Sequence, residues 1–236
     1  MKPIVPLILA FSAAWVAVGP PARGLAVPVD LEPSLLSLLI DAILGGTHGA
    51  IAVNAIEFNS RSSEVIPFTL LDSEPAILTF ADSLDALATR ILPTGGTSPA
   101  QAYVLAIGAM GDETGAAPNG FESTRQIIDI TGDGPPNPGR EPDDERDTAL
   151  AAGVDAINGL AIEIPSNSFP ATVTAVHNFY LGGNDSFLVE ARIGDDLHAK
   201  VLQKLHRDVA GIPEPASAAL LVLGSSVLTA RRRRIG

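Results

Sequence analysis

Two aspartates in an apolar stretch are the residues of this sequence whose types and spacing most directly suggest chemistry. Residues 125–134 contain a run of isoleucines interrupted by Asp129 and ending at Gly132-Asp133-Gly134. A β-branched apolar run that stops at such a turn predicts a buried strand, and open α/β sheets bind ligands at the carboxyl ends of their strands. Asp133 is therefore the first candidate for a binding role. An ordinary turn-forming role for both aspartates remains the alternative.

A second candidate element lies in residues 93–99, where Gly95-Gly96-Thr97-Ser98 precedes Pro99. Pro is favoured at the first position of a helix, so this loop leads directly into the N-terminus of a helix predicted over residues 99–110. Helix N-termini favour anions and hydroxyl-bearing residues. Thr97 and Ser98 could contribute hydroxyl groups to a site, although Ser98 as a simple helix cap explains the same pattern.

The elements that must position these residues alternate between strand and helix along the chain. The leucine-rich segment at residues 33–44 could form a helix that begins at Pro33 and ends before Gly45-Gly46, either deeply buried or not helical at all. Residues 165–183 have no clear pattern. The alternation predicts an α/β fold with a doubly wound, mostly parallel sheet and helices on both faces. A polar turn between the first two strands predicts an antiparallel hairpin there. The expected strands cover residues 49–58, 64–71, 125–134, 154–164 and 187–193, and the expected helices cover residues 74–90, 99–110, 142–153 and 195–209.

Composition excludes several classes of site. The chain has 236 residues and a formal net charge of −12. Because it contains no Cys, it has neither a disulfide framework nor a thiolate metal site. Its basic residues are concentrated at the two ends, which leaves the body more acidic than the whole. Such a body repels phosphate backbones, so we expect no nucleic-acid partner.

The N-terminus has the features of a secretory leader. Lys2 is followed by an apolar run over residues 4–18 and by the small-residue sequence Gly24-Leu25-Ala26. This order is typical of a signal peptide, which we expect to cover residues 1–26. A buried N-terminal helix is the alternative, but the prolines in this stretch disfavour it.

The C-terminus carries three features in a fixed order. Pro213-Glu214-Pro215 is followed by an apolar stretch over residues 216–230 and then by four arginines. The arginines favour a short transmembrane helix with the tail inside and the body outside. Residues 212–236 resemble a PEP-CTERM sorting signal. That resemblance implies processing by an exosortase-type enzyme, transient inner-membrane anchoring and delivery to the cell surface or extracellular matrix.

Several blocks of the body are similar to one bacterial family. They are Gly95-Gly96-Thr97-Ser98, the strand and turn that continue to Pro135-Pro136-Asn137, and residues 149–159. In this order they resemble the von Willebrand factor A-like proteins of the domain of unknown function 1194. The likeness runs over about residues 49–209, within a body at residues 27–211, and implies the von Willebrand A fold.

The resemblance also implies a metal site and shows where this chain departs from it. Such domains hold Mg²⁺ or a similar divalent cation through an Asp-x-Ser-x-Ser motif after the first strand, a loop Thr and a later Asp. Thr97 and Asp133 match the last two, with Ser98 and Asp129 as neighbouring or supporting groups. No Asp-x-Ser-x-Ser occurs in the sequence. The first strand is therefore lacking, or it is replaced by residues 35–44, and the metal site is incomplete.

Together these features predict an exported, cell-surface or matrix-associated binding or adhesion module rather than an enzyme. Its partner would be a protein or an extracellular polysaccharide. A decayed family member without activity is one alternative. A hydrolase using Asp133, His177 or a serine is another, but the sequence contains no Gly-x-Ser-x-Gly, His-Glu-x-x-His or Walker motif.

Overall fold

The computed structural model describes residues 5–12, 40–41, 43–44, 50–58, 61–88, 99–121, 123, 125–133, 142–163, 169–192, 195 and 197–210. Thr97, Ser98 and the sorting signal expected at residues 212–236 lie outside this set. Within the described residues, no helix is long and apolar enough to cross a membrane.

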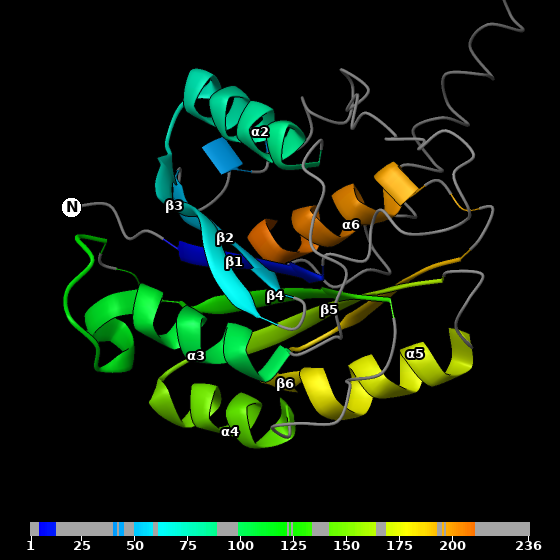
Figure 1. Cartoon of the computed structure of the whole chain (residues 1–236). Helices are drawn as coiled ribbons and strands as arrows, with labels where there is room; N and C mark the ends of the chain where they lie inside the picture. Colours follow the sequence, from blue (N-terminus) through cyan, green and yellow to red (C-terminus); the bar gives the residue numbers. More distant parts are fainter. Residues whose placement is uncertain are drawn as a thin grey trace, which may run out of the picture.

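One seven-stranded sheet forms the centre of the molecule (Figure 1). The order along it is β3, β2, β1, β4, β5 and β6, and β7 also pairs with β5. Pairing is parallel from β2 through β1 and β4 to β5 and on to β7, whereas β3 and β6 are antiparallel to their neighbours. The expected parallel sheet with an N-terminal hairpin is confirmed. The strands are β1 (Val5–Ser12), β2 (Ile51–Phe58), β3 (Ser62–Leu71), β4 (Ile127–Gly132), β5 (Ala156–Ile162), β6 (Gly182–Gly183) and β7 (Leu188–Ala191).

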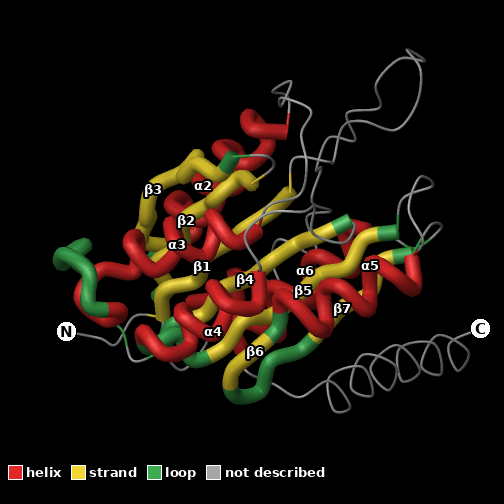
Figure 2. The backbone as a smooth tube through the Cα atoms, turned by 60° about the horizontal axis from the view of Figure 1, so that its bottom comes forward, coloured by secondary structure: helices red, strands yellow, loops and turns green. Residues whose placement is uncertain are grey.

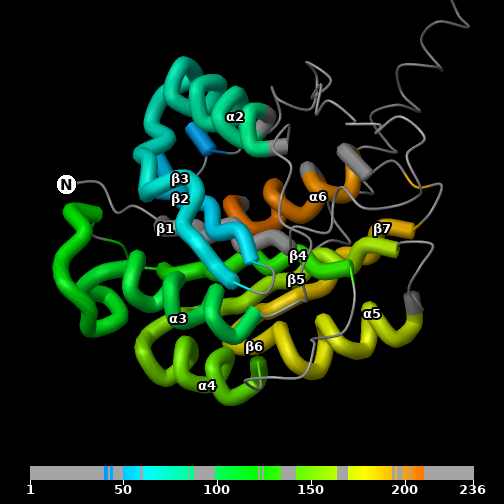
Figure 3. Tube along the Cα trace, viewed as in Figure 1, coloured from blue at the N-terminus to red at the C-terminus, as the bar shows by residue number. Residues whose placement is uncertain are grey.

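Helices cover both faces of the sheet, as Figures 1 and 3 show. Helices α2 (Glu74–Ala88) and α6 (Leu197–Ala210) lie on one face. Helices α3 (Pro99–Met110), α4 (Pro142–Ala152) and α5 (Phe169–Ala175) lie on the other. The turned view in Figure 2 shows the sheet running between these two layers. Helices α2, α3, α4 and α6 begin and end close to the residues that the sequence predicts.

The alternation of side chains along β4 explains why the sheet needs helices on both sides. Ile128 and Ile130 are fully buried in a cluster with Tyr103 of α3. Ile127 points the other way, into a cluster with Phe80 of α2. Since successive strand residues face opposite sides of a sheet, a strand with buried residues at both sets of positions must be covered on both faces.

The central position of the sheet is filled by a segment that the sequence did not lead us to expect. The first strand is replaced, but by Val5–Ser12 rather than by residues 35–44. Ile40, Asp41, Ile43 and Leu44 are helical instead, and Ile43 is buried in the α2 cluster. An apolar run fits the core of a leader and a buried strand equally well, because periodicity alone does not separate them. Cleavage after Ala26 remains a prediction.

The segment without a clear pattern also contains regular structure. Helix α5 continues into a π-helix, η3 (Val176–Tyr180), that packs on β5. Gly159 in β5 makes this close approach possible, because a Cβ there would lie 2.7 Å from Leu181 Cδ2 and 2.8 Å from Val176 Cγ1. A glycine inside a strand often marks such an approach.

Two glycine substitutions should therefore act in opposite directions. Gly159→Ala should lower the free energy of unfolding by about 1–3 kcal/mol, because it overpacks the contact between β5 and η3. Gly108→Ala, on the exposed side of α3 with no atom within 4 Å of the new Cβ, should raise it by about 0.5–1 kcal/mol. Urea unfolding of the two variants measures both effects. Equal effects in the two variants would contradict the packing described here.

Candidate functional site at the carboxyl edge of the sheet

Asp133 lies directly after β4, at the carboxyl edge of the sheet, where the sequence places it. Only 6% of its surface is exposed, and its backbone carbonyl accepts a hydrogen bond from Thr172 Oγ1 at 3.3 Å. Burial raises the pKa of the Tyr180 phenol, and the negative charge of Asp133 raises it further. A buried carboxylate and a phenol that stays protonated thus share this edge.

Tyr180 is the last residue of η3, and its backbone is hydrogen-bonded to α3. Its backbone carbonyl accepts a hydrogen bond of 2.9 Å from the hydroxyl of Tyr103 in α3. Both tyrosine side chains are almost completely buried, and burial raises the pKa of Tyr103 well above its ordinary value. Both phenols therefore stay protonated, and the hydroxyl of Tyr103 fixes η3 against α3.

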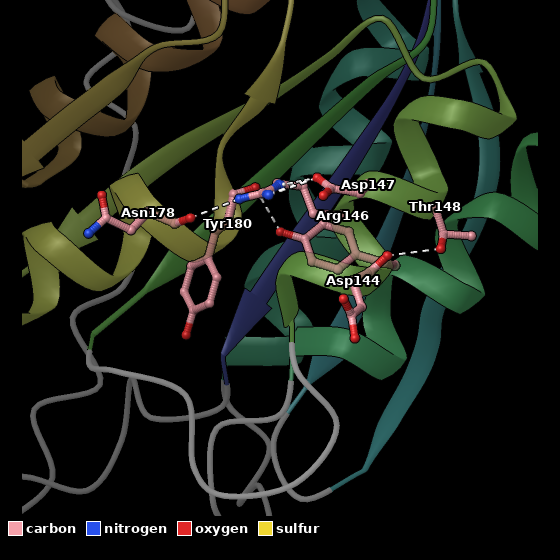
Figure 4. Close-up of polar contacts among 7 residues, drawn as sticks. Asp144, Arg146, Asp147, Thr148, Asn178 and Tyr180 are labelled. Atoms are coloured by element: carbon pink, nitrogen blue, oxygen red, sulfur yellow. Dashed lines mark hydrogen bonds and ion pairs between the residues drawn. The ribbon is translucent and has the colours of Figure 1, made fainter.

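Arg146 of α4 connects its helix to the same π-helix (Figure 4). Its Nη1 donates to the carbonyl of Asn178 at 2.8 Å, and its Nη2 lies 2.7 Å from Asp147 Oδ1. His177, a residue of the hydrolase alternative, is exposed, and its Nδ1 lies 3.3 Å from Asn178 Oδ1. The hydrogen bond from Arg146 to Asn178 thus joins α4 to η3, the element that ends at Tyr180.

Strand β1 ends at the same edge of the sheet as β4. Phe11 pairs with Thr131, and β1 ends one residue later at Ser12. Within the described part of the chain, no group of three or more histidines or acidic residues could hold a metal ion. Hard cations need several oxygen ligands. The described residues alone do not fit a divalent cation, and Thr97 and Ser98 lie outside them.

Asp129 has a different environment from Asp133. It lies in the middle of β4 and makes an ion pair with Lys204 of α6. Lys204 also lies 3.2 Å from Asp208, whose other oxygen accepts a 2.6 Å hydrogen bond from Asn158 in β5. All four side chains are at least 96% buried. They form a polar cluster, defined as Asp129, Asn158, Lys204 and Asp208, beneath the sheet rather than at its edge.

This polar cluster contains one cation and two carboxyl groups. Burial raises the pKa of Asp129 to about 8, because loss of water outweighs the attraction of Lys204, and the charge of Asp208 raises it further. If Asp129 keeps its proton, the positive charge of Lys204 and the negative charge of Asp208 cancel, and the cluster is neutral. The only part of this cluster that is visible in the sequence is the i,i+4 spacing of Lys204 and Asp208 on a helix. The same spacing is typical of an exposed salt bridge, so it does not indicate burial.

The family model described as "Protein of unknown function (DUF1194)" matches residues 36–213, and the chain belongs to this family. The matched range begins after β1. Among curated proteins, no significant match was found.

The von Willebrand A-like fold of this chain is similar to that of several solved structures. The pilus adhesin SpaC of Lactobacillus rhamnosus GG aligns with a TM-score of 0.56 at 12% identity over 89% of this chain and 30% of SpaC. The PilB minor pilin of Streptococcus sanguinis gives 0.53 at 8% identity over 91% of this chain and 64% of PilB. BatB of Bacteroides thetaiotaomicron aligns with a TM-score of 0.48 at 16% identity, over 86% of this chain and 98% of BatB. The chain thus spans less than two thirds of either pilus protein.

Replacing Lys204 of the polar cluster by a neutral side chain should lower the free energy of unfolding. Lys204→Met should destabilise the protein by about 3–5 kcal/mol, because it leaves buried carboxyl groups without their partner. Lys200→Met, on the same helix but partly exposed, should change the free energy of unfolding by less than about 0.5 kcal/mol. Chemical denaturation compares the two. Equal, small effects would show that Lys204 is not buried in an ion pair.

The raised pKa of Asp129 gives a pH dependence of definite sign. Between about pH 4 and pH 8 the folded protein holds a proton that the unfolded chain releases. Stability from this group is therefore present at low pH and is lost as the pH rises through that window. Urea unfolding at several pH values should show this fall for the parent and a flatter profile for Asp129→Asn. Identical profiles for both proteins would contradict the assignment.

Proposed function

We propose that this protein is an exported binding module, without enzymatic activity, that uses the carboxyl edge of its sheet around Asp133 to contact a partner. The observation that carries the proposal is a buried carboxylate at the end of β4 in a von Willebrand A-like fold. In open α/β sheets this edge is the usual place for a ligand. SpaC, which shares the fold, is a pilus adhesin, and this favours binding over catalysis as the role of the fold here.

A divalent cation would have few ligands at this edge. Asp133 offers a carboxylate, and Thr97 matches the loop threonine of the related domains. A cation held by so few groups gains little over water, so Mg²⁺ would bind weakly. We therefore propose that partner binding depends on the shape and hydrogen bonds of the edge, with the cation as a secondary contribution.

The ends of the chain favour a location at the cell surface or in the extracellular matrix. Residues 1–26 have the features of a leader, and residues 212–236 resemble a PEP-CTERM sorting signal. Related signals belong to bacteria that make extracellular polysaccharide. A polysaccharide of that kind, or a surface protein embedded in it, is the partner class we propose, and an exosortase-type enzyme is the processing partner.

The proposal can be tested by binding of the purified chain to extracellular polysaccharide from a producing bacterium, measured by co-sedimentation with and without millimolar Mg²⁺. Asp133→Ala should reduce the bound fraction at least several-fold. Asp82→Ala removes the same charge from an exposed position on α2 and should bind as the parent does.

Thermal unfolding under the same conditions identifies the role of the cation. A ligand that binds only the native state raises the unfolding midpoint by mass action. We expect a small shift with Mg²⁺ in the parent and none in Asp133→Ala. Binding that is equal in the parent and both variants would overturn the proposed site, and a folded protein that binds neither polysaccharide nor surface protein would favour the decayed alternative.

A further inference from the structure

The N-terminal segment has two incompatible descriptions. Its sequence fits a leader that is removed, whereas its backbone is the central strand of the sheet. We propose that Val5–Ser12 is a permanent strand of the folded protein. Loss of residues 1–26 would then leave a gap between β2 and β4 that the rest of the domain cannot close.

The pairing of β1 is continuous on both sides. All eight of its residues, from Val5 opposite Ile51 to Ser12 opposite Phe58, are in register with β2. Its residues from Leu7 to Phe11 are in register with β4. Every backbone group in the middle of this strand therefore has a neighbour in a parallel ladder on each side.

The single proline of the strand lies where a sheet can accept it. Pro6 is opposite Ala52 of β2, but pairing with β4 begins only at Leu7. Proline cannot donate to a ladder, so it is tolerated near the start of a strand and not between two paired neighbours. The sequence of the segment is thus compatible with the position that its backbone occupies.

The gap left by removing β1 could not be closed by a small movement. Strands two places apart in a sheet are separated by about 9–10 Å. On one side of β1, β2 is fixed by its hairpin with β3, and on the other, β4 is fixed by β5. Helix α3 packs against β1, β2 and β3 together. Closing the gap would break these contacts, and leaving it open would bury unpaired N–H and C=O groups of β2 and β4.

Use as a leader and use as a strand exclude each other at any one time. A segment inserted in a membrane cannot at the same time pair with β2 and β4. The family match over residues 36–213 does not include β1, so membership of the family does not supply this strand. On this proposal the folded protein keeps residues 5–12, so a chain exported as proposed above carries its leader uncut.

Proline scanning of the full-length chain tests the proposal. Leu9 is opposite Ala55 on one side and Asp129 on the other, so Leu9→Pro removes a donor from the middle of the sheet. It should lower the thermal midpoint by at least about 6 °C. A midpoint equal to that of the parent would overturn the proposal.

A second experiment leaves the sequence of β1 unchanged, so its result does not depend on whether a substituted chain can fold. A protease recognition sequence inserted after residue 18 of the full-length chain allows the folded protein to be cut in solution. The N-terminal fragment should co-elute with the body in size-exclusion chromatography and separate from it only in denaturant. After separation, the body should refold to a cooperative unit only when a synthetic peptide of residues 1–18 is added, and a peptide of reversed sequence should not replace it. A body that unfolds cooperatively at the parent midpoint without the peptide would overturn the proposal.

Discussion

The pairing of β1 with both β2 and β4 is the constraint on which the rest of the structure depends. On one side of it lie β2 and β3, and on the other lie β4, β5 and the short strands that pair with β5. Parallel sheets occur almost only where both faces are covered. The helix layers, the two apolar clusters and the edge that carries Asp133 all presuppose that these halves are held in one sheet.

A second constraint lies beneath the sheet, where charged groups replace apolar ones. Lys204 and Asp208 bring α6 onto β4 and β5 through Asp129 and Asn158, whose backbones are directly opposite each other in the ladder. Buried ion pairs contribute little net stability, because removing charges from water costs about as much as their attraction gains. Their effect here is to fix where α6 lies, since a shifted helix would leave the carboxyl groups without a partner. Phe187, beside Lys204 and Arg207, closes this side of the cluster.

The sequence predicted those parts of the fold in which local pattern and final environment agree. The isoleucines of β4 and the Pro99 start of α3 are such cases, and so is the position of Asp133. The role of Val5–Ser12 was not predictable, because one apolar run serves as a leader or as a buried strand. The burial of Lys204 was not predictable either, since it depends on Asp129, far away in the sequence. The π-helix at Val176–Tyr180 depends on the space above Gly159, which only the packed structure reveals.

The most direct test of the account is native-state hydrogen exchange on the full-length protein, read at single amides. If Val5–Ser12 is the central strand, the amides of Leu9 and Ala10 should exchange as slowly as those of Ile128 and Ile130, through global unfolding alone. Exchange at Leu9 and Ala10 at the rate of an unstructured peptide, while the β4 amides stay protected, would contradict it. The sheet would then hold together without this segment, and the N-terminus would be a leader and nothing more.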